Sequence, residues 1–165
     1  GRGSFTHLTS AALFDAMGIG DRVSFIAYGD GNAPVELLAG RIDAAIQWPG
    51  QFVSYQESGD LTVLAVTGSE RVPVLPDVAT AAEQGIEIDI TMWRGLAAPA
   101  GTPDDVVTAL QNAAEAAVQS DQFQEAAGNI GFSPAFMGAA EFGTLIERDD
   151  AFYGTLLEEL GLAAE

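Results

Sequence analysis

The chain has 165 residues, of which 24 are acidic and six are basic, and its formal net charge is −18 at pH 7. All six basic residues are Arg. Because phosphate binding requires clustered Lys and Arg, this balance excludes nucleic acids and anionic membrane surfaces as partners. The absence of Cys excludes disulfides, thiol nucleophiles and thiolate metal sites, while 48% hydrophobic residues suffice for a folded core.

The acidic residues are spread along the chain and do not have the spacing of a calcium loop. Residues 1–95 hold 12 acids and five Arg, a net charge of −7, whereas residues 96–165 hold 12 acids and one Arg, a net charge of −11. A lysine-free acidic chain is typical of a halophilic protein, although an ordinary acidic protein is the alternative. No apolar run approaches the ~18 residues of a membrane span, and residues 1–4 do not open a signal peptide, so we expect no membrane insertion.

The first half of the chain alternates helical patterns with short apolar runs. Ser4 or Thr6 is positioned to cap a helix that ends at Gly18. This alternation is typical of an α/β fold with a parallel sheet, and the nearly continuous apolar run 61–66 suits a strand buried on both faces. The predicted helices after the first are 34–39 and 49–57, and the predicted strands are 23–28, 42–46 and 61–66.

The second half reads as mainly helical. Residues 86–92 alternate at period two and predict a half-buried strand, and Thr102 is expected to cap a helix with Pro103 at its first position. The region 93–99 is therefore our candidate boundary between an α/β portion and a helical portion. The remaining predictions are a loop at 72–78, a helical turn at 80–84, a second strand segment at 95–99, a helix at about 120–129 and a last helix through residues 145–160.

Catalytic options are few. His7 is the only His, and without Cys and Lys the possible bases and nucleophiles reduce to Ser, Thr, Tyr and carboxylates. We interpret His7 as a first-turn helix residue or a ligand contact, and the adjacent acids, such as Asp149 and Asp150, as solvated faces. We therefore predict no catalytic residues, no metal site and no cofactor, and expect the protein not to be an enzyme.

Two glycine-rich turns are more informative. Residues 1–4 open a helix, and residues 29–32 follow a predicted strand and open another, so both can point backbone N–H groups at an anion. Each can equally be a tight turn, but together they favour a small carboxylate ligand. Trp48 and Trp93, at strand ends, can wall a pocket or pack in the core, and Arg94 can pair with a ligand carboxylate or with a neighbouring acid.

The motifs in this order resemble the periplasmic solute-binding proteins of the tripartite tricarboxylate transporter family. The resemblance covers nearly the whole chain, and its most specific stretch is Trp93-Arg94-Gly95-Leu96-Ala97-Ala98-Pro99-Ala100-Gly101-Thr102-Pro103. The other segments that carry it are Gly3-Ser4 with His7-Leu8, then 28–34, 38–43, 64–67, Arg71 and 75–80 with Glu83 and Gly85.

The resemblance implies a two-lobed protein that closes on a small carboxylate outside the cytoplasm and delivers it to membrane transporter subunits. It implies a type 2 periplasmic-binding-protein-like lobe with a parallel or mixed sheet flanked by helices, plus C-terminal helices of the other lobe. Residues 1–93 would form the second lobe and 94–165 the return to the first lobe, whose N-terminal part is expected to be absent, so that a homo-oligomer is possible. The alternative is an interaction or oligomerisation module that keeps the fold without transport.

The ligand-binding residues that we predict lie in the glycine-rich turns and at the strand ends. Departures from the family pattern, such as Gly29-Asp30 and Ala79, concern substrate identity and leave the ligand unnamed. The residues are Gly3, Ser4, Phe5, Thr6, Tyr28, Gly31, Asn32, Gln47, Trp48 and Trp93.

Overall fold

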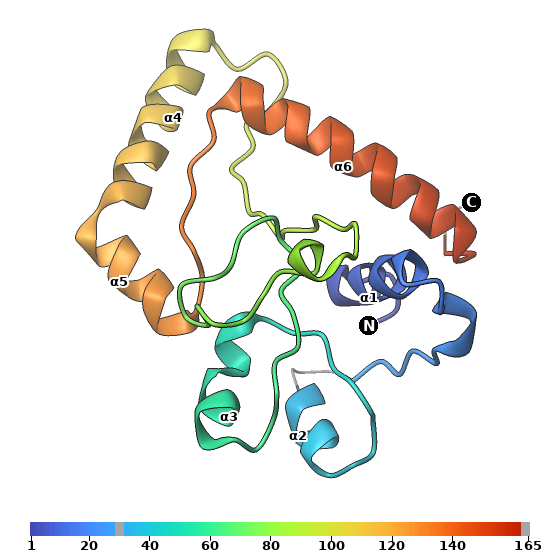
Figure 1. Ribbon diagram of the computed structural model, residues 1–165. Coiled ribbons are helices and arrows are strands. Elements are labelled where there is room, and N and C mark those ends of the chain that lie inside the picture. The colour runs from blue at the N-terminus through green and yellow to red at the C-terminus, as the bar shows by residue number, and fades with distance from the viewer. Residues whose placement is uncertain (29–31, 163–165) are drawn as a thin grey trace.

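Long helices on the outside and irregular backbone on the inside characterise the computed structural model, which describes residues 1–28 and 32–162. In Figure 1, α4 and α5 follow one another along one side, and α6 runs from near the start of α4 toward α1, while α2 and α3 lie at the opposite end. The elements in chain order are α1 (Phe5–Ala16), η1 (Gly20–Arg22), α2 (Ala33–Leu38), η2 (Pro49–Gln51), α3 (Val53–Ser58), η3 (Ala82–Gln84), α4 (Asp104–Gln119), α5 (Asp121–Ile130) and α6 (Ala139–Glu159), where η marks a 3₁₀ helix.

Several helices begin or end at the cap residues that the sequence predicts. Ser4 caps α1 by accepting a hydrogen bond from the His7 N–H, and Ser120 caps α5 in the same way. The predicted helix 49–57 is divided at Phe52 into η2 and α3, which ends at Gly59 in the left-handed conformation.

One predicted cap is wrong. Pro103 is the N-cap residue of α4, and the Thr102 hydroxyl donates to the Pro99 carbonyl at 2.8 Å without capping the helix. The helix therefore begins one residue later than predicted. Asp104 and Asp105 still lie in its first turn, where their negative charges interact favourably with the positive end of the helix dipole.

The predicted sheet is not confirmed. Among the residues that the structure describes, the segments predicted as strands are extended but form no strand ladder, and a single parallel bridge joins Val66 to Thr80. On the other side of Val66, the Ile90 N–H donates to the Thr67 carbonyl at 2.8 Å. Three extended segments therefore lie side by side at one point only.

Side chains form hydrogen bonds with backbone groups that would pair with a neighbouring strand in a longer ladder. The Gln56 side chain accepts from the Val63 N–H at 2.7 Å, and the Gln84 side chain donates to the Leu64 carbonyl at 2.9 Å. Leu64 is 75% exposed, so the predicted burial of 61–66 on both faces is wrong. The segment 86–92 keeps its alternating burial up to buried Ile90, although it is not paired as a strand.

The core lies beneath the bridge between residues 66 and 80. Val66, Leu75 and Val78 form it, and Thr80 beside them is 2% exposed. Thr80 and Glu83 satisfy each other's backbone N–H groups, with distances of 2.7 and 3.0 Å, and so form a capping box for η3. None of the described helices is long and apolar enough to cross a membrane.

Candidate functional site

A cavity of about 420 Å³ opens between α1, α6 and the segment that joins the two halves of the chain. Its size lies within the range of small-molecule sites. We call it the aromatic cavity because three of its six lining residues are aromatic. The lining residues are Phe5, Met92, Trp93, Arg94, Gly95 and Tyr153.

Aromatic rings also pack behind this cavity. Phe5 stacks on Trp48 with ring centroids 6.5 Å apart and meets the edge of Tyr153 at 6.4 Å. Phe132, which follows α5, forms an edge-to-face pair with Trp48, with ring centroids 5.1 Å apart. Rings from four distant parts of the chain therefore form one connected cluster around the start of α1.

The first turn of α1 supplies polar groups next to the cavity. The Ser4 and Thr6 hydroxyl groups lie 3.2 Å apart, and the Gly3 N–H donates to His7 Nδ1 at 2.9 Å, so these groups are used within the turn. In the described part of the chain, the N–H groups of Phe5 and Thr6 have no acceptor. These two N–H groups are the donors that a helix start offers to an anion.

His7 lies inside the molecule and does not line the cavity. It is 8% exposed, and its ring lies 4.0 Å from that of Phe25. Burial lowers the pKa of His7 below its ordinary value, and the charge of Arg2 lowers it further. Neutral His7 can then accept the hydrogen bond from Gly3 at Nδ1, which holds the turn before α1.

Helix α6 fixes the cavity wall at Trp93. The Trp93 indole N–H donates to Asp149 Oδ2 at 2.7 Å, and Asp149 is 7% exposed. Phe142 and Trp93 pack edge to face with ring centroids 5.0 Å apart, and the Phe142 ring lies so close to Gly95 that a Cβ atom there would displace it. The wall is therefore held at two points, one polar and one apolar.

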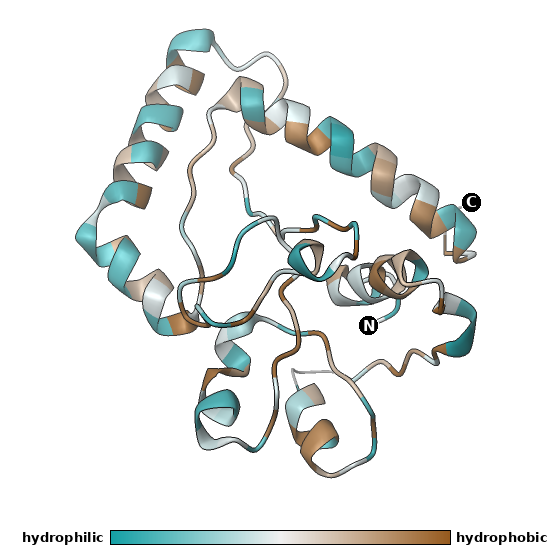
Figure 2. Ribbon diagram, viewed as in Figure 1, coloured by the Kyte–Doolittle hydropathy of each residue, from teal (hydrophilic) through white to brown (hydrophobic). Residues whose placement is uncertain are grey.

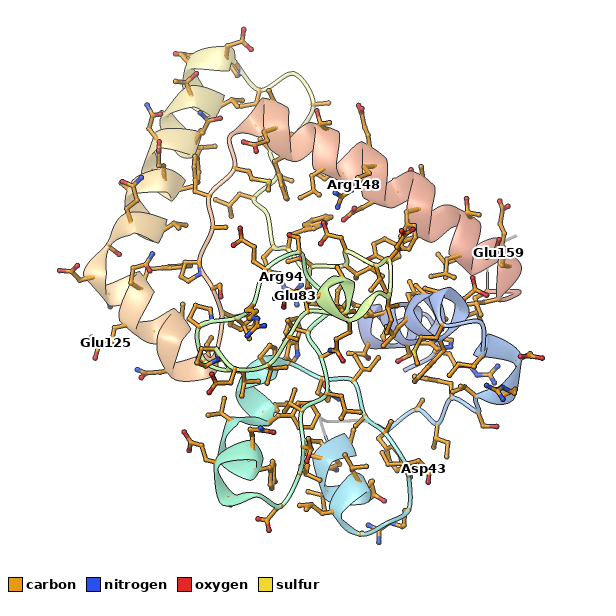
Figure 3. The ribbon with its side chains drawn as sticks, in the orientation of Figure 1. Asp43, Glu83, Arg94, Glu125, Arg148 and Glu159 are labelled. Atoms are coloured by element: carbon orange, nitrogen blue, oxygen red, sulfur yellow. The ribbon has the colours of Figure 1, made fainter. Side chains whose placement is uncertain are left out.

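Arg94 is the cation of the aromatic cavity (Figure 3). Three other arginines form ion pairs within the described residues, namely Arg41 with Glu36, Arg71 with Glu83 and Arg148 with Asp149. Arg94 forms none there: its guanidinium lies 5.8 Å from the centre of the Trp48 ring and donates to the Trp93 carbonyl at 3.1 Å.

A second cavity, of about 590 Å³, lies between α1, α6 and residues 87–91. We call it the acidic groove, because five carboxylates line it against the single cation Arg148. An anionic ligand would meet net repulsion there, so the smaller aromatic cavity is the better carboxylate site. The five carboxylates belong to Asp15, Glu87, Asp89, Asp149 and Glu159.

Tyr153 lies at the boundary of the two cavities and lines both. Burial raises the pKa of Tyr153 to about 12, and the charge of Asp149 adds to the shift. The phenol therefore stays neutral at physiological pH and does not repel an anion.

The structure brings together only part of the predicted set. Phe5 and Trp93 line the aromatic cavity, and Trp48 packs behind it. Tyr28, Asn32 and Gln47 line neither cavity, and Gly31 lies outside the described residues. Asn32 is the N-cap residue of α2, where its side chain makes no capping hydrogen bond.

The residues that the sequence did not predict lie on or beside the C-terminal helices. Tyr153, Phe132 and Asp149 had no recognisable motif, and the prediction that Asp149 lies on a solvated face is wrong, since Trp93 and Arg148 cover it. The described residues contain no group of three or more His, Asp or Glu side chains placed to hold a metal ion.

Comparison with known proteins identifies relatives of the whole chain. A family model described as the tripartite tricarboxylate transporter family receptor matches residues 1–162. A protein in the gbd 5' region of Cupriavidus necator, named as a UPF0065 protein, is 31% identical over 98% of this chain and 49% of its own length. The chain therefore spans about half the length of this relative.

Solved structures agree with the family match. A TctC solute-binding protein from Polaromonas, crystallised without ligand, gives a TM-score of 0.82 at 33% identity, over 96% of this chain and 55% of its own. The R. palustris protein Rpa4515, solved with adipate, gives a TM-score of 0.73 at 27% identity, over 97% of this chain and 54% of its own. The chain thus has a periplasmic-binding-protein-like fold, although its own described residues form no sheet.

Proposed function

Because the chain belongs to the tripartite tricarboxylate transporter receptor family, we propose that it captures a small carboxylate outside the cytoplasm and presents it to the membrane subunits of a transporter. The observation that carries this proposal is the aromatic cavity, which combines the cation Arg94 with the start of α1. The family is one of substrate-binding receptors, which supports a protein that binds without catalysing a reaction.

The carboxylate would be held by two kinds of donor. The N–H groups of Phe5 and Thr6, which have no acceptor among the described residues, lie at the positive end of α1, where an anion is stabilised, and Arg94 can form charge-assisted hydrogen bonds from the other wall. Trp93 and Tyr153 would cover the bound acid and exclude water from these bonds. Tyr28, Asn32 and Gln47, together with Gly31, remain proposed ligand contacts of a closed form.

We also propose that residues 1–93 form one lobe and that residues 94–165 return to the other. Two observations support this division: the Cupriavidus necator relative and the Polaromonas protein are each about twice as long as this chain, and the C-terminal helices carry apolar residues, seen in Figure 2 as brown segments of α4, α5 and α6. Such faces need a covering partner in a soluble protein. The exposed side chains include Val106, Leu110, Phe123, Ile130, Ile146 and Phe152.

Isothermal titration with mono-, di- and tricarboxylates in molar salt tests the proposed function. We expect heat of binding from at least one acid and a loss of that heat in Arg94→Gln. Light scattering on the same sample gives the oligomeric state. A stable dimer that binds none of the acids would contradict the receptor function and favour the interaction module.

A further inference from the structure

We infer that the preferred ligand of the aromatic cavity is a monocarboxylate with a flat apolar body, such as an aromatic acid, and not a di- or tricarboxylate. This inference rests on the proposed function and narrows its substrate class. The observations that support it are the charge of the lining, the faces of its rings and the position of Arg94.

The charge of the lining favours one carboxylate. Arg94 is the single ionisable cation among the six lining residues, and none of the six is acidic. A second or third carboxylate would have no cationic partner within the cavity, and it would also face the acidic groove, which shares Tyr153. An unpaired charge that leaves water loses its hydration without gaining a partner, so each further carboxylate opposes binding.

The apolar part of the lining favours a flat body. Phe5, Trp93 and Tyr153 offer ring surface, and Met92 adds a flexible apolar chain that fits irregular shapes. Aromatic pairs add attraction beyond their buried area, which a branched, hydroxylated acid cannot gain. Because Asp149 and Phe142 hold Trp93 from behind, that ring is in place before the ligand arrives.

Arg94 is placed to bind the carboxylate at the edge of the flat ligand. Its contacts with the Trp48 ring and the Trp93 carbonyl orient the guanidinium without neutralising it, and no described carboxylate forms an ion pair with it. Tyr153, neutral at physiological pH, adds no opposing charge. One planar cation beside ring surfaces therefore matches one carboxylate attached to a ring.

The experiment compares benzoate, benzamide, adipate and citrate by isothermal titration at one ionic strength. We expect benzoate to bind at least about tenfold more tightly than the other three, a difference of about 1.4 kcal/mol. Tighter binding of adipate or citrate would overturn the monocarboxylate inference and leave the receptor function standing. Equal binding of benzamide would overturn the role of Arg94, and no heat from any acid would contradict the proposed function itself.

Two variants locate the site. Arg94→Gln should weaken benzoate at least about tenfold, since it removes the single cation of the cavity. Arg22→Gln is the matched control, because Arg22 is exposed in η1, outside both cavities, and its loss changes the net charge equally. Both variants should unfold at the temperature of the parent chain. Unchanged benzoate affinity in Arg94→Gln, or equal weakening in Arg22→Gln, would overturn the inference.

Discussion

Asp149 is the residue on which the wall of the aromatic cavity depends. Its carboxylate is buried, accepts the indole N–H of Trp93 and pairs with the more exposed Arg148. A part-buried hydrogen bond to a charged acceptor contributes more to stability than a surface ion pair does. The bond to Trp93 is therefore the part of this arrangement that matters for stability.

Replacing Asp149 by Ala should lower the free energy of unfolding by about 1–3 kcal/mol, because it removes a part-buried hydrogen bond to a charged acceptor. Asp150→Ala is the control: Asp150 is the next residue on α6 and is exposed, so its change should stay within about 0.5 kcal/mol. Urea unfolding followed by circular dichroism measures both. Equal effects of the two substitutions would show that the bond to Trp93 adds nothing.

His7 makes stability depend on pH near neutrality. Its pKa in the folded chain lies below the ordinary value of 6.5, because burial disfavours the charged ring. Between these two pKa values the unfolded chain binds more protons than the folded chain. The stabilisation by neutral His7 is therefore complete above pH 6.5 and is lost as the pH falls through that window.

Comparison with His7→Gln isolates this effect. The Gln side chain does not titrate and keeps an oxygen that can accept the Gly3 N–H, so the parent chain should lose its advantage over the variant as the pH falls from neutrality toward 5.5. Carboxylates affect both proteins alike and cancel in the difference. Parallel pH profiles of the free energy of unfolding would exclude His7 as the cause.

A site residue can be predicted from the sequence only when its role depends on residues near it in the chain. Phe5, Trp48 and Trp93 were predicted because they stand beside a helix start or at strand ends, and the structure gathers their rings. Tyr153 and Asp149 lie within α6, where the helical repeat shows which residues share a face and not which distant segment that face meets. Their roles arise from contacts more than 50 positions apart, such as Trp93 with Asp149.

At the scale of elements, helices were predictable and strand pairing was not. Caps such as Ser4 and Ser120 act within three residues, so their pattern is visible in the sequence. Pairing of the segment 61–66 instead depends on competition for its backbone groups, and the side chains of Gln56 and Gln84 occupy two of them. Apolar runs predict extended backbone, but they do not show whether its N–H and C=O groups pair with another strand or with side chains.

The backbone of η2 contacts the end of α5, and this contact joins the two halves of the chain. A Cβ atom on Gly50 would overlap the Ile130 carbonyl, and one on Gly131 would lie 2.5 Å from the Gly50 Cα. The ring pair of Trp48 and Phe132 lies just beside this contact. Glycine at position 50 thus lets the ring cluster behind the cavity close.

Gly50→Ala should lower the free energy of unfolding by about 1–3 kcal/mol, since the added methyl meets rigid backbone. Gly154→Ala is the opposite control: it lies inside α6 with open space around its Cβ position, so Ala should stabilise the chain by about 0.5–1 kcal/mol. Thermal unfolding of both variants gives the comparison. A Gly50→Ala variant as stable as the parent chain would mean that the halves do not approach so closely.

At the scale of the whole molecule, the charge of −18 acts on the surface. Asp149 is the one buried acid among the described residues, and the labelled Asp43, Glu125 and Glu159 lie at the edges of the view in Figure 3. Three ion pairs within the described residues offset little of the excess. Repulsion between exposed charges falls as salt shortens the Debye length from about 10 Å at 0.1 M to about 3 Å at 1 M.

Stability should therefore rise steeply with salt, and the C-terminal segment should be responsible for more of the rise because its net charge is −11. Neutralising three exposed acids there, Glu125, Glu147 and Glu158, to Gln should raise the melting temperature in dilute buffer and flatten its salt dependence. The matched control changes Asp43, Glu57 and Glu70, which are also exposed and line neither cavity, to Asn or Gln and should act less. Both triple variants remove the same charge, so a larger effect of the second set would contradict stronger repulsion in the C-terminal segment. A parent chain that is equally stable in dilute buffer and in molar salt would contradict the halophilic interpretation.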